Sequence, residues 1–433
     1  MSIMNIALTR SEITGKLLAI VFAIACCIGH FYYNNATLIY NCCLLVCAAL
    51  LVRSVKHKYL FLFACFVSTY ILFLYPYFIN NLSIGIYYEI SGPSSYQKAI
   101  FLFSIFLTSL LFFFKDQPSV PVADRLPVYD SNIVFFINIV VMVAIIFFGA
   151  SGESIISSSY GSNRTETSTI YVYFPVFFLA AYLSSGRRKM QLYLMHIVGF
   201  AFVLKSLLLG GRGNTITMGL IIYLLFFDSR MSFPTFILVL VVGFVFFALF
   251  GYLRAAKNLT SINLADAFAI GSSYRDKYVA ASSNQTDVFY ASVRIITMVD
   301  TGIITTLERI WAFALFCVSI FVPYSILPPL ANLSNYKLDV YNSLGGGLIF
   351  AYFYTYLSYG GIILAGYLVN KVWDNLRTSK SLYTLVYSIL VFATMNGWFA
   401  YNPITLFKLC LWAVFYIFAM DMLNKALKRR KAW

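Results

Sequence analysis

A glycine-flanked arginine separates two long apolar runs, in the sequence Gly210-Gly211-Arg212-Gly213-Asn214. A tight glycine-rich turn exposes backbone N–H groups, and a helix beginning beside it adds its positive dipole end. With the Arg212 guanidinium these groups favour a phosphate, although a plain turn with an arginine among lipid headgroups fits the same residues. Lys205 lies in the preceding apolar run, where an ammonium needs a partner, a wet cavity or the interface. We expect Lys205, Gly211 and Gly213 to help Arg212 bind substrate.

Several other arginines lie away from the strongly basic loops of the chain. The guanidinium donates hydrogen bonds in pairs and stays charged at any biological pH, so arginine suits a diphosphate. Pairing with nearby acids or lipid phosphates is the alternative, favoured for Arg275 beside Asp276 and for Arg309 beside Glu308. The full set is Arg164, Arg212, Arg254, Arg275, Arg294 and Arg309.

Motifs for metal, nucleotide and serine chemistry are missing from the sequence. It contains no His-Glu-x-x-His helix, no Cys/His ligand set, no Walker glycine loop and no Gly-x-Ser-x-Gly elbow. Its three histidines are scattered along the chain. We therefore predict neither a metal nor a cofactor, and metal-dependent hydrolysis and ATP-driven transport are disfavoured.

The elements that must position these residues are predicted to be membrane-spanning helices. The chain has 433 residues, 61% of them hydrophobic and 11% charged, with a mean hydropathy of +0.81. Apolar runs long enough to cross about 30 Å of hydrocarbon as helices recur throughout. The sequence predicts an all-α polytopic membrane protein with about 12 transmembrane helices, at 17–33, 36–52, 59–79, 98–114, 132–150, 169–185, 191–209, 215–228, 234–252, 347–368, 382–398 and 405–423.

The positions of the basic residues behind the net charge of +15 indicate how the chain is oriented in the membrane, and do not indicate a nucleic-acid partner. Lys and Arg gather in the loops that follow the even-numbered spans up to the tenth, and at both ends of the chain. By the positive-inside rule, these loops and both termini are cytoplasmic.

The longest connection lies on the opposite side of the membrane. We divide the chain into 1–252 with nine spans, 253–346 as a large external loop between the ninth and tenth spans, and 347–433 with three spans and a basic cytoplasmic tail. The segment 310–327 is apolar enough to span, but counting it would place the basic loop 369–381 outside. We predict that it is re-entrant or interfacial, ended by Pro323, Pro328 and Pro329.

Taken together, these features resemble the Wzy-type O-antigen polymerases, a family of oligosaccharide repeat-unit polymerases. The resemblance covers the span count and the latter half of the chain. One departure is that relatives often carry an acidic residue shortly after a glycine triplet, whereas 348–358 contains none. The matching pieces are Gly210–Gly213, Gly251-Tyr252-Leu253-Arg254, Phe321–Pro328, and Gly345-Gly346-Gly347 leading into Tyr359–Ile363.

The resemblance implies a GT-C-like glycosyltransferase bundle in the bacterial inner membrane, inverting and metal-independent. Such an enzyme moves a growing glycan from undecaprenyl diphosphate onto another lipid-linked repeat unit at the periplasmic face. Its implied partners are undecaprenyl-diphosphate-linked oligosaccharides and membrane lipids, alongside a chain-length regulator and a flippase. The alternatives are an O-antigen ligase, which relies on a loop histidine that 197–433 lacks, and a lipid-linked oligosaccharide flippase or transporter, for which two similar halves are expected.

The resemblance also suggests roles for particular residues. Arg212 and Arg254 would hold the diphosphate, with Arg275 or Arg294 closing over it and Arg164 serving the acceptor. The general base is left open among the acids of the external region. The predicted catalytic residues are Arg212, Arg254, Arg294 and Asp300, the other candidate bases are Asp287 and Asp339, and Tyr290 and Tyr341 join the substrate-binding residues.

Overall fold

The structure is a computed structural model in which helices dominate. It describes residues 10–80, 93–116, 120–151, 166–209, 211–255, 284–341 and 346–431. Side chains are described for these ranges except at 244, 247–255 and 427–431. The strands found there are β1 (Ala150–Ser151) and β2 (Glu166–Thr167), which pair antiparallel. The predicted all-α class is confirmed.

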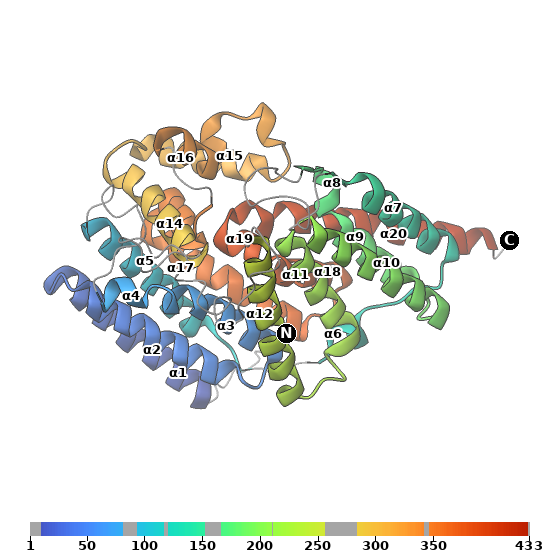
Figure 1. The fold of residues 1–433 in the computed structure, drawn as a ribbon, viewed down its shortest axis with the longest axis horizontal. Coiled ribbons are helices and arrows are strands. Elements are labelled where there is room, and N and C mark those ends of the chain that lie inside the picture. The colour runs from blue at the N-terminus through green and yellow to red at the C-terminus, as the bar shows by residue number, and fades with distance from the viewer. Residues whose placement is uncertain are drawn as a thin grey trace, which may run out of the picture. The chain divides into compact units, whose positions relative to one another are not determined.

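The chain forms two compact units, and each is described by itself. The first comprises Met1–Ser119, Gly271–Asp374 and Met395–Ile404. In it α5 is the central helix, packed against α1, α2 and α14 (Figure 1). Its elements are α1 (Arg10–Cys27) with the π-helix η1 (Ile28–Tyr32), α2 (Ala36–Ser54), α3 (Lys58–Leu72), α4 (Tyr75–Phe78), α5 (Pro93–Phe113), α14 (Asn284–Asp300), α15 (Thr306–Ser319), the 3-10 turns η5 (Tyr324–Ile326) and η6 (Pro329–Ala331), α16 (Leu333–Tyr341), most of α17 (Ile349–Thr378), α19 (Met395–Ala400) and the start of η7 (Pro403–Leu406).

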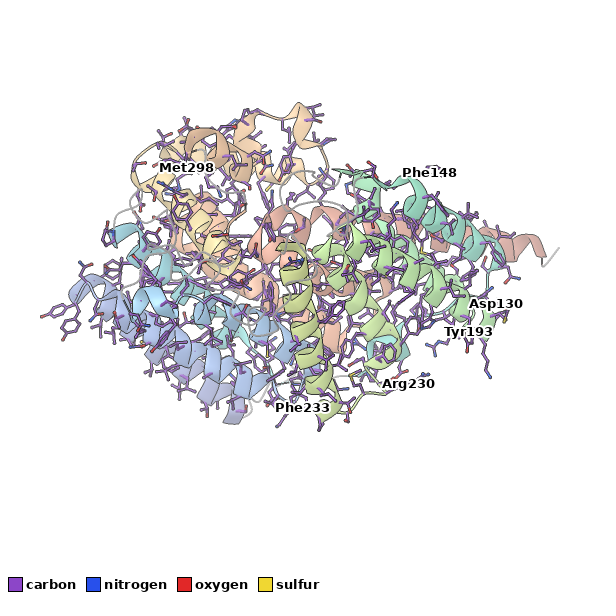
Figure 2. The ribbon with its side chains drawn as sticks, viewed as in Figure 1. Asp130, Phe148, Tyr193, Arg230, Phe233 and Met298 are labelled. Carbon is purple, nitrogen blue, oxygen red and sulfur yellow. The ribbon has the colours of Figure 1, made fainter. Side chains whose placement is uncertain are left out.

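The second unit comprises Val120–Ile270, Asn375–Thr394 and Thr405–Trp433. Within it α7 packs on α9, α10 on α11, and α18 on α20. Phe148 and Tyr193 project from its surface (Figure 2), with 87% and 70% of their area exposed. Its elements are α6 (Val122–Arg125), α7 (Asn132–Phe148), α8 (Thr169–Val172), α9 (Phe174–Ser184), α10 (Lys189–Leu208), α11 (Arg212–Ile222) with the π-helix η3 (Tyr223–Phe227), α12 (Phe233–Ala255), α18 (Leu382–Ala393) and α20 (Lys408–Lys431).

Six helices in the described ranges are long and apolar enough to cross a membrane. The remaining predicted spans fall on shorter apolar helices, one of which, Phe174–Ser184, covers only about 16 Å at 1.5 Å per residue. The structure is therefore compatible with a multi-pass membrane protein. The long helices are Ser11–Tyr32, Ala36–Ser54, Pro93–Phe113, Lys189–Leu208, Ile349–Thr378 and Pro403–Ala426, and the shorter ones are Lys58–Leu72, Asn132–Phe148, Phe174–Ser184, Arg212–Phe227, Phe233–Gly243 and Leu382–Ala393.

Several predicted boundaries are wrong where backbone chemistry overrides hydropathy. The predicted helix 59–79 ends at Leu72, and a separate short helix carries Pro76 near its start, because proline cannot continue a helix from within. The predicted helix 169–185 is divided in the same way before Pro175. In contrast, α17 continues through most of the predicted loop 369–381, as far as Thr378.

The described part of the predicted loop 253–346 is largely helical. A capping box joins Thr305 and Glu308 at the start of α15, whose 14 residues extend about 21 Å. That is shorter than a hydrocarbon layer of about 30 Å. Leu307, Ile310 and Trp311 leave 76%, 63% and 55% of their area exposed on one side of α15. The prediction that 310–327 is interfacial or re-entrant stays a prediction.

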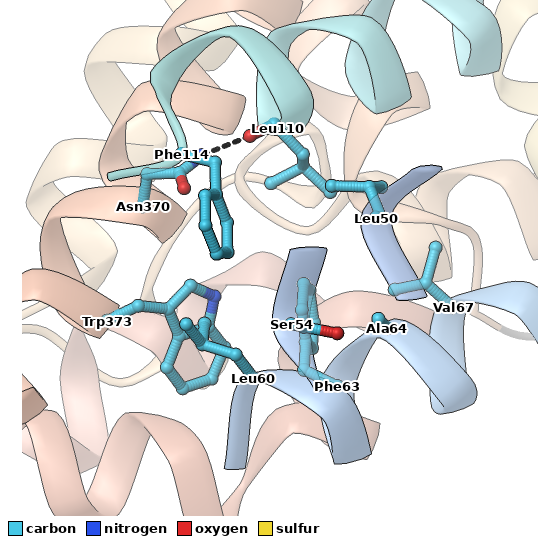
Figure 3. A pocket seen from close by; sticks show the side chains of 10 residues that line it. All are labelled: Leu50, Ser54, Leu60, Phe63, Ala64, Val67, Leu110, Phe114, Asn370 and Trp373. Atoms are coloured by element: carbon cyan, nitrogen blue, oxygen red, sulfur yellow. Dashed lines mark hydrogen bonds between the residues drawn. The ribbon is translucent and has the colours of Figure 1, made fainter. Parts of the chain in front are cut away.

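A small apolar pocket in the first unit is a packing feature of the core. It lies among α2, α3, α5 and α17, and Asn370 and Ser54 are the polar residues in its lining (Figure 3). The Asn370 amide is already bonded, donating to the Leu110 carbonyl at 3.1 Å. We assign this pocket no chemistry.

Candidate functional site

Helix α14 presents an acid, a phenol and a guanidinium along one side. Residues three and seven positions apart on an α-helix share a face, and this spacing relates Asp287, Tyr290 and Arg294. Asp287 stands in the first turn, where the helix dipole favours negative charge. The helix is buried from Val288 to Ile296, so packing on both sides fixes the orientation of these side chains.

Arg294 lies between two tyrosines that the sequence also identified as site residues. Its guanidinium carbon is 5.2 Å from the centre of the Tyr290 ring and 4.8 Å from that of Tyr341. Its Nε donates to the Tyr290 hydroxyl at 2.7 Å. Only 2% of Arg294 is exposed, and a desolvated cation–π contact contributes about 2 kcal/mol. We call these three residues the arginine–tyrosine cluster.

Lys337 is a fully buried lysine on the same side of α16 as Tyr341, four residues away. Its Nζ donates to the Gly346 carbonyl at 2.8 Å. Burial lowers the pKa of Lys337 to about 7, because the apolar surroundings disfavour the charged ammonium. Lys337 was not among the predicted site residues. Its position one helical turn before Tyr341 is the signal that could have found it.

The glycine turn at Gly346-Gly347 is bonded to α16 and to α19. The Gly346 N–H donates to Ser334 Oγ at 2.8 Å, and the Gly347 N–H donates to the Ala400 carbonyl at 3.1 Å. Both residues have positive φ, +88° and +147°. A Cβ at Gly347 would stand 2.7 Å from Ile295 Cδ1, so the turn requires glycine in the space that it occupies.

The turn is also tied directly to α14. The Leu348 N–H donates to Ser292 Oγ at 2.7 Å. Lys337, which binds the Gly346 carbonyl, shares a side of α16 with Tyr341 of the arginine–tyrosine cluster, so the glycine turn and the cluster contact the same side of α16. Together, the cluster, Lys337 and the turn form the candidate site of the first unit.

Asp300 takes part in a separate ionic contact. It stands at the end of α14, about 9 Å along the helix axis from Arg294. Its carboxylate accepts from Lys98 Nζ at 2.5 Å and from the Tyr354 hydroxyl at 3.5 Å. The ammonium also lies 5.1 Å from the centre of the Tyr354 ring. The role of Asp300 as a base stays a prediction.

Arg309 stabilises a break in α17. Leu357 and Ser358 have non-helical dihedral angles, with φ of +57° at Ser358. In a continuous helix the carbonyls of Tyr354 and Thr355 would accept from N–H groups four residues later. Instead they accept from Arg309 Nη2 and Nε, both at 2.7 Å. The expectation of a structural role holds for Arg309, but its partners are these carbonyls rather than Glu308, which caps α15.

The glycine-flanked arginine of the second unit starts a helix, as predicted. Arg212 is the first residue of α11 and Gly211 precedes it. The Gly211 N–H donates to the Ser206 carbonyl at 2.7 Å, and Ser206 Oγ donates back to the Gly211 carbonyl at 2.8 Å. Gly213 lies in the first turn of α11, and Arg212 is half-buried. The turn therefore places a guanidinium at a helix start.

Lys205 contacts carbonyls in the structure. Its Nζ donates to the carbonyls of Ile146 and Phe147 at the end of α7. A cation there complements the negative end of the helix dipole. To bind an anion, as predicted, Lys205 would have to give up this contact with the end of α7.

For the remaining predicted site residues, the described ranges show no contact with these clusters. Arg164 and Arg275 lie outside the described ranges. The Arg254 backbone belongs to α12, but its side chain is not in the described part. Arg294 belongs to the first unit, whereas Arg212 and Arg254 belong to the second. Their convergence on one diphosphate stays a prediction.

Metal-ligating side chains do not gather anywhere in the described ranges, where no three His, Cys, Asp or Glu come together. Comparisons of the chain with protein families, with curated proteins and with solved structures give no match. Function is therefore argued from the site.

Proposed function

We propose that this protein is an inverting membrane glycosyltransferase that polymerises polyprenyl-diphosphate-linked oligosaccharide repeat units, as the O-antigen polymerases do. The observation that carries the proposal is the buried arginine–tyrosine cluster beside the glycine turn. A permanent cation in apolar surroundings is costly unless it has a task or a partner of opposite charge. The Tyr290 and Tyr341 side chains hold the Arg294 guanidinium in place, and binding of an anionic substrate is the task that we assign to it.

A lipid diphosphate is the anion that such a site suits. It is an activated leaving group, and negative charge builds on its oxygens as the sugar departs. One preorganised donor lowers such a barrier by about 3 to 4 kcal/mol. The guanidinium fork matches two phosphate oxygens at once, and the tyrosine rings hold it in place before substrate arrives.

The proposed architecture puts this site at the periplasmic surface. Twelve helices cross the membrane, both termini are cytoplasmic and 253–346 is external, as the distribution of Lys and Arg favours. On this topology α14, α16 and the glycine turn face the side on which lipid-linked repeat units are joined. Arg212 and Arg254 would bind the same diphosphate, Arg164 and Arg275 would complete the site, and a chain-length regulator and a flippase would act beside it.

Deletion of the gene tests the proposal, with surface polysaccharide separated on gels. We expect glycan chains capped at a single repeat unit. Total loss of attached glycan would instead indicate a ligase, and cytoplasmic accumulation of lipid-linked units would indicate a flippase. An unchanged ladder of chain lengths would refute all three functions.

Substitution of Arg294 tests the site within that function. Arg294→Ala should give single-repeat capping, and Arg294→Lys should shorten the ladder because lysine keeps the charge but loses the fork. Arg230→Ala is the matched control, since Arg230 is an exposed arginine of the second unit (Figure 2). Membrane levels of each variant are measured alongside. A normal ladder in Arg294→Ala would remove Arg294 from the mechanism.

A further inference from the structure

The three acids that remain candidates for the general base have different surroundings. Asp300 is bound by Lys98 at 2.5 Å, so its carboxylate is occupied. Asp339 is exposed on α16, where water competes for it. Asp287 is half-buried on α14, and among the described residues no side chain pairs with it. Only Asp287 combines a partly desolvated carboxylate with a place on the Arg294 face of the helix.

Asp287 lies on the same side of α14 as Arg294, two turns before it. The Arg294 side chain is directed toward that end of the helix, because its Nε donates to the Tyr290 hydroxyl one turn earlier. In an inverting transfer the general base acts on one side of the anomeric carbon and the cation that stabilises the leaving group acts on the other. One face of α14 carries both kinds of group.

The electrostatic surroundings agree with a base. Burial raises the pKa of Asp287 above its ordinary value, which moves a carboxyl toward the pH at which general bases work. Lys98 is occupied by Asp300 and Lys337 by the Gly346 carbonyl. The helices packed against α14 are α3, α5 and α16, whose charged side chains are Lys58, Lys98, Lys337 and Asp339.

We propose that Asp287 is the general base of the polymerisation, an inference that rests on the proposed function. Asp287 accepts the proton of the acceptor sugar hydroxyl as that oxygen attacks the anomeric carbon of the donor glycan. The new C–O bond forms while the bond from the anomeric carbon to the diphosphate oxygen breaks. The electron pair leaves with the polyprenyl diphosphate beside Arg294, and the proton stays on Asp287 until solvent removes it.

The test uses the full-length protein in lipid nanodiscs with its lipid-linked repeat units, and follows chain growth. Asp287→Asn should lower kcat by about 10²- to 10⁴-fold, the usual contribution of general base catalysis, with a much smaller change in KM. Asp287→Glu should keep part of the activity. Asp130→Asn is the matched control, because Asp130 is an exposed acid in a surface ion pair with Arg188 (Figure 2) and should leave kcat unchanged.

Chemical rescue separates a lost base from a lost fold. Formate should restore part of the rate of Asp287→Ala, because a small carboxylate can occupy the vacated space, and it should not restore Arg294→Ala. If the unaltered protein makes chains and Asp287→Asn grows them at an undiminished rate, the assignment of Asp287 is wrong while the function stands. If the unaltered protein makes no chains from lipid-linked units, the function itself fails.

Discussion

Replacement of Lys337 by methionine gives a direct measure of how strongly the core of the site excludes charge. Burial holds the pKa of this ammonium near 7, whereas an unfolded lysine keeps its proton up to about pH 10.4. Between these values the unfolded chain binds one more proton than the folded chain. The free energy of unfolding therefore rises with pH in that window, by up to about 1.4 kcal/mol per pH unit.

The expected size follows from the same numbers. Because the folded amine is still half protonated near its pKa, the rise from pH 7 to pH 9 should be about 2 kcal/mol. Methionine matches the aliphatic stem of lysine in length and does not titrate, so Lys337→Met should lack this rise. Its loss of the bond to the Gly346 carbonyl should lower stability by about 1 kcal/mol independently of pH.

The assay is unfolding of both proteins in the same detergent, followed by far-ultraviolet circular dichroism at several pH values. The difference between the two curves isolates Lys337, because every other titrating group is shared. We expect the unaltered protein to gain stability relative to the variant as pH rises from 7 to 9. Parallel pH dependences would show that Lys337 is not buried as a neutral amine. They would contradict the buried contact between its Nζ and the Gly346 carbonyl.

Two further predictions concern the framework around the site. Arg309→Gln should lower the free energy of unfolding by roughly 2 to 4 kcal/mol, because two carbonyls at the break in α17 lose charged donors, and urea or thermal unfolding in detergent measures it. Single cysteines at Asn335 and Arg230, both exposed, should react with a membrane-impermeant thiol reagent from opposite sides of the membrane in oriented vesicles. Labelling of both from one side would contradict the proposed topology.

Hydropathy located the helices because burial against lipid and burial in a helical core select the same residues. Each of the twelve predicted runs overlaps at least one helix in the described ranges. The ends were less predictable, since they depend on local backbone chemistry. Leu72 ends α3 inside a run that remains apolar, and α17 passes Lys371 and Arg377 without interruption. Arg377 is 1% exposed, although an arginine in a predicted basic loop is expected to face water.

The residues of the arginine–tyrosine cluster were predicted one by one, but their arrangement was not. Arg294, Tyr290 and Tyr341 were each identified from their residue type and region. Their contact depends on the packing of α14 on α16. No spacing of residues in the sequence predicts that these two helices pack together. Lys337 was missed for the same reason, because a lysine in a predicted loop is expected to be exposed. Lys205 was expected near an anion, and the carbonyls that it contacts belong to another helix, α7.

Preorganisation of Arg294 depends on how the first turns of α17 are held. Ser292 of α14 binds the start of α17 through the Leu348 N–H. Six and seven residues further along, just before the break, the carbonyls of Tyr354 and Thr355 accept hydrogen bonds from Arg309.

The segment of α17 between these contacts is therefore fixed at both ends, and the break at Ser358 separates it from the rest of the helix. The break allows the part of α17 that follows it to move without displacing the glycine turn. A cation that stabilises a leaving group must not reorganise while the charge develops. Binding the turn and the arginine–tyrosine cluster to the same short helical segment satisfies that condition. Loss of the Arg309 hydrogen bonds should therefore loosen the site as well as destabilise the fold.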